Sequence, residues 1–144
     1  MDAMKRMLIE HECARLIVDY AHKIDHLDVD GFVNLFTKDA VYKQASQDKP
    51  WIGHDQIRTW VKNYPRDQTV RHVASNIKID VIDENSAKAS SYTTVYKSLN
   101  HKGAEPSPRT TPRCVVEYLD DFVRQPEGWK IKSRRYTYQF FNAD

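Results

Sequence analysis

The sequence predicts an α+β fold in which three N-terminal helices pack on a curved, mostly antiparallel sheet. Apolar residues recur every three or four positions through the first part of the chain, and residues 69–141 are rich in β-branched and aromatic side chains. Turn-forming residues divide this second part into two pairs of strands. Helices followed by a separate run of strands are typical of an α+β domain.

Three helices are expected before residue 65. Between residues 4 and 24, apolar side chains recur at helical spacing, and neither proline nor glycine interrupts the pattern before Gly31. A second, short helix follows, for which Asp28 or Asp30 is the expected N-cap. A short strand at residues 40–42 comes next. The third helix covers residues 54–64 and is stopped by Pro65.

Four longer strands are expected after the helices. They cover residues 69–81, 87–99, 114–123 and 129–141. Turn-forming residues at 83–85 close the first hairpin, and those at 126–128 close the second. Between the hairpins, residues 100–112 contain one glycine and three prolines, which predicts a loop.

The first of these strands does not alternate cleanly between polar and apolar residues. Strict alternation places His72 and Asn76 on one face and Ile77, Ile79 and Val81 on the other. A β-bulge at residues 74–76 would bring both sets toward the interior, and bulges are frequent beside active sites. The sequence therefore predicts a bulge in this strand.

Length and composition exclude several classes of protein. A chain of 144 residues is typical of one domain, so a single domain over residues 1–144 is expected. Its net charge of +2 comes from 22 basic and 20 acidic residues that are interspersed, whereas nucleic-acid binders usually carry a basic patch or stripe. No apolar run approaches the ~20 residues that span a membrane. We therefore expect neither a nucleic-acid nor a membrane partner.

The two cysteines favour a reducing compartment. Cys13 and Cys114 lack the spacing of metal ligands, and the N-terminal residues do not have the apolar core of a secretory signal. Free thiols are more common than disulfides under these conditions. A cytoplasmic location is the resulting expectation.

Six segments occur in an order that resembles a known family. They are residues 20–25 (YAHKID), 30–36 (DGFVNLF), 39–42 (DAVY), 53–60 (GHDQIRTW), 71–76 (RHVASN) and 128–131 (GWKI). The family is that of the SnoaL-like polyketide cyclases, within the nuclear-transport-factor-2-like superfamily. The resemblance implies a cone-shaped α+β barrel, a small hydrophobic molecule in its pocket, no cofactor, and a homo-oligomer that is a dimer or trimer.

The resemblance also implies a catalytic pair. Scytalone dehydratase and the lindane dehydrochlorinase are similar proteins with an aspartate at the end of the first helix and a histidine on the first long strand. In both, the histidine is the base and the aspartate orients it, which implies these roles for His72 and Asp25. Tyr42 resembles a tyrosine of the scytalone dehydratase pocket. A second pocket histidine is missing, because Thr94 or Tyr96 lies near its expected position.

The chemistry of the two residue types fits these roles. An unperturbed imidazole has a pKa of about 6.5 and therefore accepts a proton near neutral pH. A carboxylate that binds one ring nitrogen fixes the tautomer, leaves the other nitrogen as the base, and stabilises the imidazolium that forms. Simpler roles stay open, in which Asp25 pairs with Lys23 or caps the second helix, and His72 is an ordinary core or surface residue.

Six further residues are candidates for substrate binding. Aromatic side chains line many small-molecule pockets, which favours Tyr20, Tyr42, Trp60 and Tyr96, although core packing also explains aromatic residues on apolar elements. Asn76 is a candidate donor to a substrate oxygen, or else caps the bulge.

Arg135 is the sixth of these candidates. It shares a strand face with Ile131, whereas Arg134 shares the opposite face with two lysines. Arg135 is therefore the better candidate to enter the pocket and hold a carboxylate or phenolate. The alternative is a salt bridge to an acidic residue of the neighbouring strand, namely Asp120, Asp121 or Glu117.

Two functional hypotheses follow. The first is a cofactor-independent lyase or isomerase that removes a proton from a small, mostly apolar cyclic substrate. The second is a non-catalytic small-molecule binding or assembly module, similar to the small subunit of a ring-hydroxylating dioxygenase. The chain contains neither a glycine-rich phosphate loop nor a serine nucleophile elbow. His22 and His26 have a spacing that zinc sites use, but without further ligands no metal site is expected.

Overall fold

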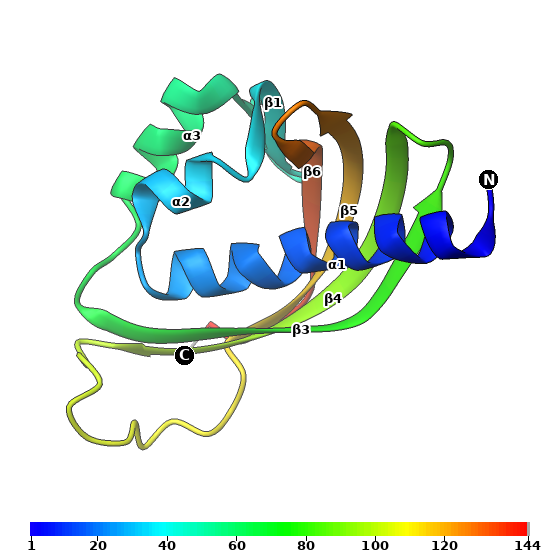
Figure 1. Cartoon of the computed structure of the whole chain (residues 1–144). Coiled ribbons are helices and arrows are strands. Elements are labelled where there is room, and N and C mark those ends of the chain that lie inside the picture. The colour runs from blue at the N-terminus through cyan, green and yellow to red at the C-terminus, as the bar shows by residue number, and fades with distance from the viewer. Residues whose placement is uncertain (144) are drawn as a thin grey trace.

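A computed structural model, which describes residues 1–143, confirms the predicted α+β fold (Figure 1). The helices are α1 (Ala3–Asp25), α2 (Val29–Val33) and α3 (Gly53–Lys62). The strands are β1 (Phe36–Gln44), β2 (Trp51–Ile52), β3 (Gln68–Val81), β4 (Ser86–Leu99), β5 (Cys114–Gln125) and β6 (Gly128–Phe141). The strand expected at residues 40–42 is thus longer at both ends, and β2 was not predicted.

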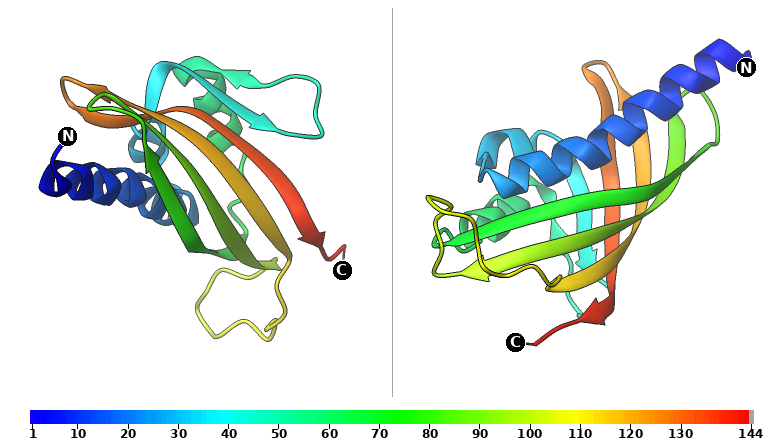
Figure 2. Two further views of the ribbon diagram at one scale, coloured as in Figure 1. Left: turned by 90° about the vertical axis from the view of Figure 1, so that its right-hand side faces the viewer. Right: turned by 90° about the horizontal axis from the view of Figure 1, so that it is seen from below.

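The strands form one curved sheet in the order β2-β1-β6-β5-β4-β3. The hairpins β3–β4 and β5–β6 are antiparallel, as predicted, whereas β1 runs parallel to β6. The three helices lie on one side of the sheet, and the loop between β4 and β5 projects from its end (Figure 2). Because β3 is an edge strand, half of its backbone N–H groups have no strand partner.

The ends of α1 are set by local interactions. The side chain of Asp2 accepts a hydrogen bond from the backbone N–H of Lys5 and caps the first turn. The helix ends at Asp25, and Leu27 then takes a positive φ of 54° that turns the chain into α2. The buried stripe of α1 is made of Ile9, Cys13, Leu16, Ile17, Tyr20, Ala21 and Ile24. This stripe turns Tyr20 toward the sheet.

The predicted bulge in β3 is present. Ser75 pairs with Tyr92 and Lys78 pairs with Ser90, so two residues of β3 lie opposite one residue of β4. Asn76, the first of the two, has a φ of 50°. The extra residue exchanges the two faces of β3. His72, before the bulge, and Ile77, Ile79 and Val81, after it, therefore all face the core. Asn76 itself is exposed at the bulge.

A second bulge, in β6, was not predicted. Ile131 pairs with Phe122 and Ser133 pairs with Asp121, which leaves Lys132 as the extra residue of the strand. Beyond the bulge, the inward side chain is Arg134 rather than Arg135. The expectation for Arg135 is therefore wrong, because strict alternation from Ile131 does not hold across the extra residue.

Both cysteines are free and buried, as expected. Within residues 1–143, no helix combines the length and the apolar character that crossing a membrane requires.

Candidate active site

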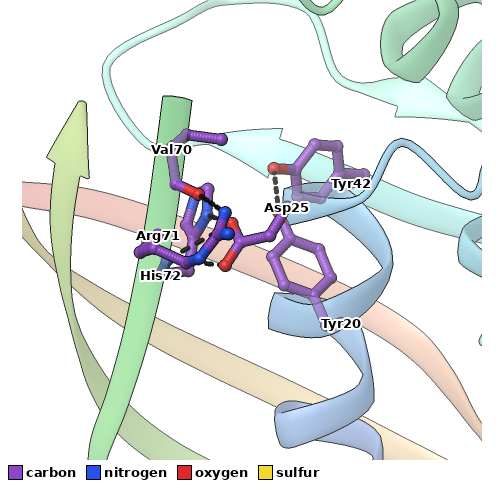
Figure 3. Close-up of polar contacts among 6 residues, drawn as sticks. All are labelled: Tyr20, Asp25, Tyr42, Val70, Arg71 and His72. Carbon is purple, nitrogen blue, oxygen red and sulfur yellow. Dashed lines mark hydrogen bonds and ion pairs between the residues drawn. The ribbon is translucent and has the colours of Figure 1, made fainter. Parts of the chain in front are cut away.

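Asp25 and His72 form a hydrogen-bonded pair between the end of α1 and β3 (Figure 3). The distance from Asp25 Oδ1 to His72 Nδ1 is 2.6 Å, and the two side chains are 7% and 8% exposed. An ionised carboxylate only accepts hydrogen bonds, so Nδ1 carries the proton that it donates. In the neutral imidazole, Nε2 is then the nitrogen with a free lone pair.

The edge position of β3 explains why the pair forms here. The backbone N–H of His72 points away from β4 and donates to Asp25 Oδ2 at 3.0 Å. Asp25 therefore replaces the strand that is missing at this edge. The neighbouring Arg71 donates from Nη1 to the carbonyl of Val70 at 2.6 Å and so covers the same edge (Figure 3).

His72 also lines a pocket of about 90 Å³. Its Nε2 makes no hydrogen bond with any of residues 1–143. The other walls of the cavity are mostly aromatic and are supplied by Tyr20, Tyr42, Trp60, Tyr64, Val95, Lys97, Cys114, Val116, Tyr118, Tyr136 and Tyr138. Pockets for drug-sized ligands occupy about 300–1000 Å³, so this cavity suits a compact molecule. We call it the tyrosine pocket.

The opposite side of the pair lines a larger surface groove. This groove, of about 420 Å³, lies between α1 and β3, and Asp25, His72 and Arg71 are among its residues. His72 thus borders both the groove and the tyrosine pocket. Within residues 1–143, no three histidine, cysteine, aspartate or glutamate side chains are grouped closely enough to hold a metal ion.

The predicted binding residues divide into two sets. Tyr20, Tyr42 and Trp60 line the tyrosine pocket, and their contact with substrate stays a prediction. Tyr96 is 38% exposed on the outer face of β4, because the alternation places Val95 and Lys97 inward. Thr94 and Tyr96 are therefore not the pocket positions of this strand.

Asn76 and Arg135 also lie outside the tyrosine pocket. Asn76 is exposed at the bulge of β3, and Arg135 is exposed on β6 beside the outer groove formed with β4 and β5. Lys97 and Tyr64 are pocket residues that the sequence did not single out. The alternation of β4 would have placed Lys97 inside once Val95 was assigned to the core.

A hydrogen-bonded pair of phenols lies deep in the tyrosine pocket. The hydroxyl oxygens of Tyr20 and Tyr42 are 2.7 Å apart (Figure 3). Burial raises the pKa of Tyr20 to about 12, although the nearby charge of Arg134 lowers it in part. Burial also raises the pKa values of Tyr42 and Tyr118 well above the usual range. These phenols therefore stay protonated at neutral pH. Since one of Tyr20 and Tyr42 donates to the other, one proton of this pair remains available for a ligand.

Arg134 supports the phenols from behind. Its guanidinium carbon is 4.2 Å from the ring centroid of Tyr20 and 3.9 Å from that of Tyr118. Two parallel hydrogen bonds, of 2.7 and 2.9 Å, join it to Asp120. Both side chains are fully buried, so the ion pair fixes the position of the two rings rather than meeting solvent.

The raised tyrosine pKa predicts a loss of stability in alkali. The phenol of Tyr20 ionises near pH 10 in the unfolded chain but near pH 12 in the folded one, so its contribution is complete below pH 10 and is lost as the pH rises toward 12. We expect the free energy of unfolding to fall less steeply over this range in Tyr20→Phe than in the wild type, by urea titration. Identical slopes would contradict the prediction.

Comparison with known proteins identifies the family. A sequence profile described as the SnoaL-like domain matches residues 5–135. The chain belongs to the SnoaL-like family. An uncharacterised protein of Mycobacterium tuberculosis is 28% identical to this SnoaL-like chain over 127 residues, which are 85% of this chain and 80% of that protein.

Solved structures share the fold at low sequence identity. The dehydrochlorinase LinA superposes with a TM-score of 0.82 at 14% identity, over 99% of this SnoaL-like chain and 93% of its own. A protein of Novosphingobium aromaticivorans with a provisional scytalone dehydratase assignment has a TM-score of 0.79 at 20% identity, over 96% and 89%. These likenesses confirm the predicted fold.

Proposed function

We propose that this SnoaL-like protein is a cofactor-independent lyase or isomerase that removes a proton from carbon in a small, mostly apolar cyclic substrate. The observation that supports this most is the 2.6 Å contact between Asp25 and His72, with Nε2 unpaired beside an aromatic pocket. The names of the structural neighbours, a dehydrochlorinase and a provisional dehydratase, belong to the same class of reaction.

The residues divide the work as follows in this proposal. Nε2 of His72 accepts the proton from a substrate carbon, and the C–H electron pair becomes a new double bond. In an elimination, the leaving group departs with its own electron pair. Asp25 stabilises the imidazolium, which then returns its proton to the leaving group or to another substrate carbon. Tyr20 and Tyr42 stay neutral and share one hydrogen bond, so the phenol that accepts in this pair donates its own proton to the oxygen or leaving group.

The alternative is a non-catalytic small-molecule binding or assembly module. The observation that favours it is the small volume of the tyrosine pocket, about 90 Å³, because aromatic side chains occupy much of the interior of the sheet. A binding module has no need of a free Nε2 at its pocket wall. Proton exchange at a bound ligand separates the two hypotheses.

The test is hydrogen–deuterium exchange at carbon. We expect the wild type to exchange C–H protons of one or more compact cyclic ketones or halides in D₂O, measured by mass spectrometry. His72→Gln should slow this exchange by about 10²- to 10⁴-fold, because it removes the base and leaves the pocket shape nearly unchanged. His11→Gln, at an exposed position of α1, is the control. Equal rates in the wild type and His72→Gln would reject the enzyme and favour the binding module.

The proposal includes two properties of the whole protein, a cytoplasmic location and a homo-oligomer, either dimer or trimer. The outer face of the sheet supports the second, because it exposes apolar side chains on three neighbouring strands, namely Val73, Tyr92, Tyr96 and Leu119. The molar mass in solution tests it.

A further inference from the structure

Lys97 is the one cation among the residues that line the tyrosine pocket. It is half-buried and follows Val95 on the inward face of β4. It also lines a second hollow, of about 140 Å³, with Ser98, Leu99, Arg109 and Arg113. Lys97 therefore stands between an aromatic cavity that contains His72 and a neighbouring hollow with a basic wall.

No acidic side chain among residues 1–143 forms an ion pair with Lys97 or Arg113. The ammonium of Lys97 lies 5.2 Å from the ring centroid of Tyr64, and the guanidinium of Arg113 lies 4.8 Å from that of Phe141. Several exposed cations of this chain do pair with a carboxylate, for example Lys78 with Asp80. Among residues 1–143, the two half-buried cations beside the pocket thus have no carboxylate partner.

The neighbouring Cys114 does not supply the missing negative charge. Burial raises the pKa of its thiol, although Lys97 and Arg113 lower it in part, so the thiol is neutral at pH 7. Burial also lowers the pKa of Lys97, and the positive charge of Arg113 lowers it further. A partly desolvated ammonium beside a second cation gains more from an anionic ligand than an exposed lysine does.

We propose that Lys97 and Arg113 bind a carboxylate of the substrate, so that the tyrosine pocket takes a compact ring that carries a carboxylate group. The ring packs against the tyrosines with one C–H beside His72, and the carboxylate points out of the aromatic cavity toward the basic hollow. The ligand supplies both a negative charge, which no side chain of residues 1–143 offers to these two cations, and an apolar body that fits the aromatic walls. This inference deepens the proposed function and rests on it for the role of the ring.

Benzoate and benzamide are the matched probes, because they share shape and differ in charge. We expect the wild type to bind benzoate at least about tenfold more tightly than benzamide, measured by calorimetry at low salt. Lys97→Met should remove most of this preference while the affinity for benzamide changes little. Lys97→Arg, which keeps the charge, should retain the preference. Lys88→Met alters an exposed lysine of the same strand and should behave as the wild type.

The outcomes distinguish this inference from the proposed function. His72→Gln should keep the preference for benzoate even where proton exchange is lost, because recognition of the carboxylate does not need the base. If the wild type does not exchange protons but its preference for benzoate depends on Lys97, the carboxylate site is supported and the proposed enzymatic activity is rejected. Equal affinities for the two probes, no binding of benzoate, or an unchanged preference in a folded Lys97→Met variant would overturn the inference.

Discussion

Replacement of Asp120 by alanine is expected to lower the free energy of unfolding by about 3–5 kcal/mol. Arg134 is 1% exposed and its guanidinium binds Asp120 through two hydrogen bonds, so the variant leaves a buried charge without a partner. Burial alone would lower the pKa of Arg134, but the charge and hydrogen bonds of Asp120 more than offset this and raise it. Without Asp120 the arginine still keeps its proton, because a guanidinium does not deprotonate in proteins, so the variant bears the cost of the unpaired charge.

Urea titration of three variants measures this effect. Asp121→Ala is the matched control, because Asp121 is the adjacent residue on β5 and pairs only loosely with Lys88, at 3.9 Å on the surface. It should change the free energy of unfolding by less than about 1 kcal/mol. The double variant Asp120→Leu with Arg134→Met should recover much of the loss, since it removes both charges together. A loss below about 1 kcal/mol in Asp120→Ala would show that the pair is not needed for folding.

The fold was predictable because most of its signals are local. The apolar stripe of α1 repeats at helical spacing and ends at Asp25, and the turns at residues 83–85 and 126–128 separate the strands. The bulge in β3 was predictable for a different reason. Two sets of residues that both belonged inside lay on opposite faces, and one extra residue resolves that conflict.

The candidate site was predictable only in part. The chain order of helix end and strand brought Asp25 and His72 together, and the family resemblance gave their roles. Arg134 was missed because the extra residue in β6, Lys132, lies in a run of basic and polar residues where either face is plausible. A slip of one residue exchanges the two faces of a strand. The same sensitivity explains why Tyr96 was chosen in place of its neighbour Lys97.

The bulge in β3 and the bulge at Lys132 of β6 both influence which side chains enter the pocket. In β3, the bulge lets His72 face inward without exposing the aliphatic residues that follow it. In β6, the bulge lets Ile131 pack in the core and also turns Arg134 under Tyr20. Without these extra residues, the inward-facing side chains at one end of each strand would point to solvent instead. The pocket therefore depends on the irregularities of β3 and β6 as well as on the regular alternation of β4 and β5.

Asp25→Asn should separate the two roles of this carboxylate, which are to orient His72 and to bind the backbone at the edge of β3. Asp25 accepts one hydrogen bond from the imidazole of His72 and another from its backbone N–H. An asparagine oxygen can still accept from the backbone, but a neutral amide stabilises the imidazolium poorly and does not enforce the same tautomer. We expect proton exchange at carbon to slow by about 10²- to 10⁴-fold, while the free energy of unfolding changes by less than about 1 kcal/mol.

Asp25→Ala provides the contrast. It removes both acceptors, so the backbone N–H at the edge of β3 also loses its partner, and a further loss of about 1–3 kcal/mol in the free energy of unfolding is expected. Exchange should slow in both variants, but stability should fall mainly in the alanine variant. If Asp25→Asn exchanges protons as fast as the wild type, the carboxylate serves only as a hydrogen-bond acceptor for the backbone N–H at the edge of β3. The 2.6 Å contact with His72 would then be structural, and His72 would work without an orienting partner.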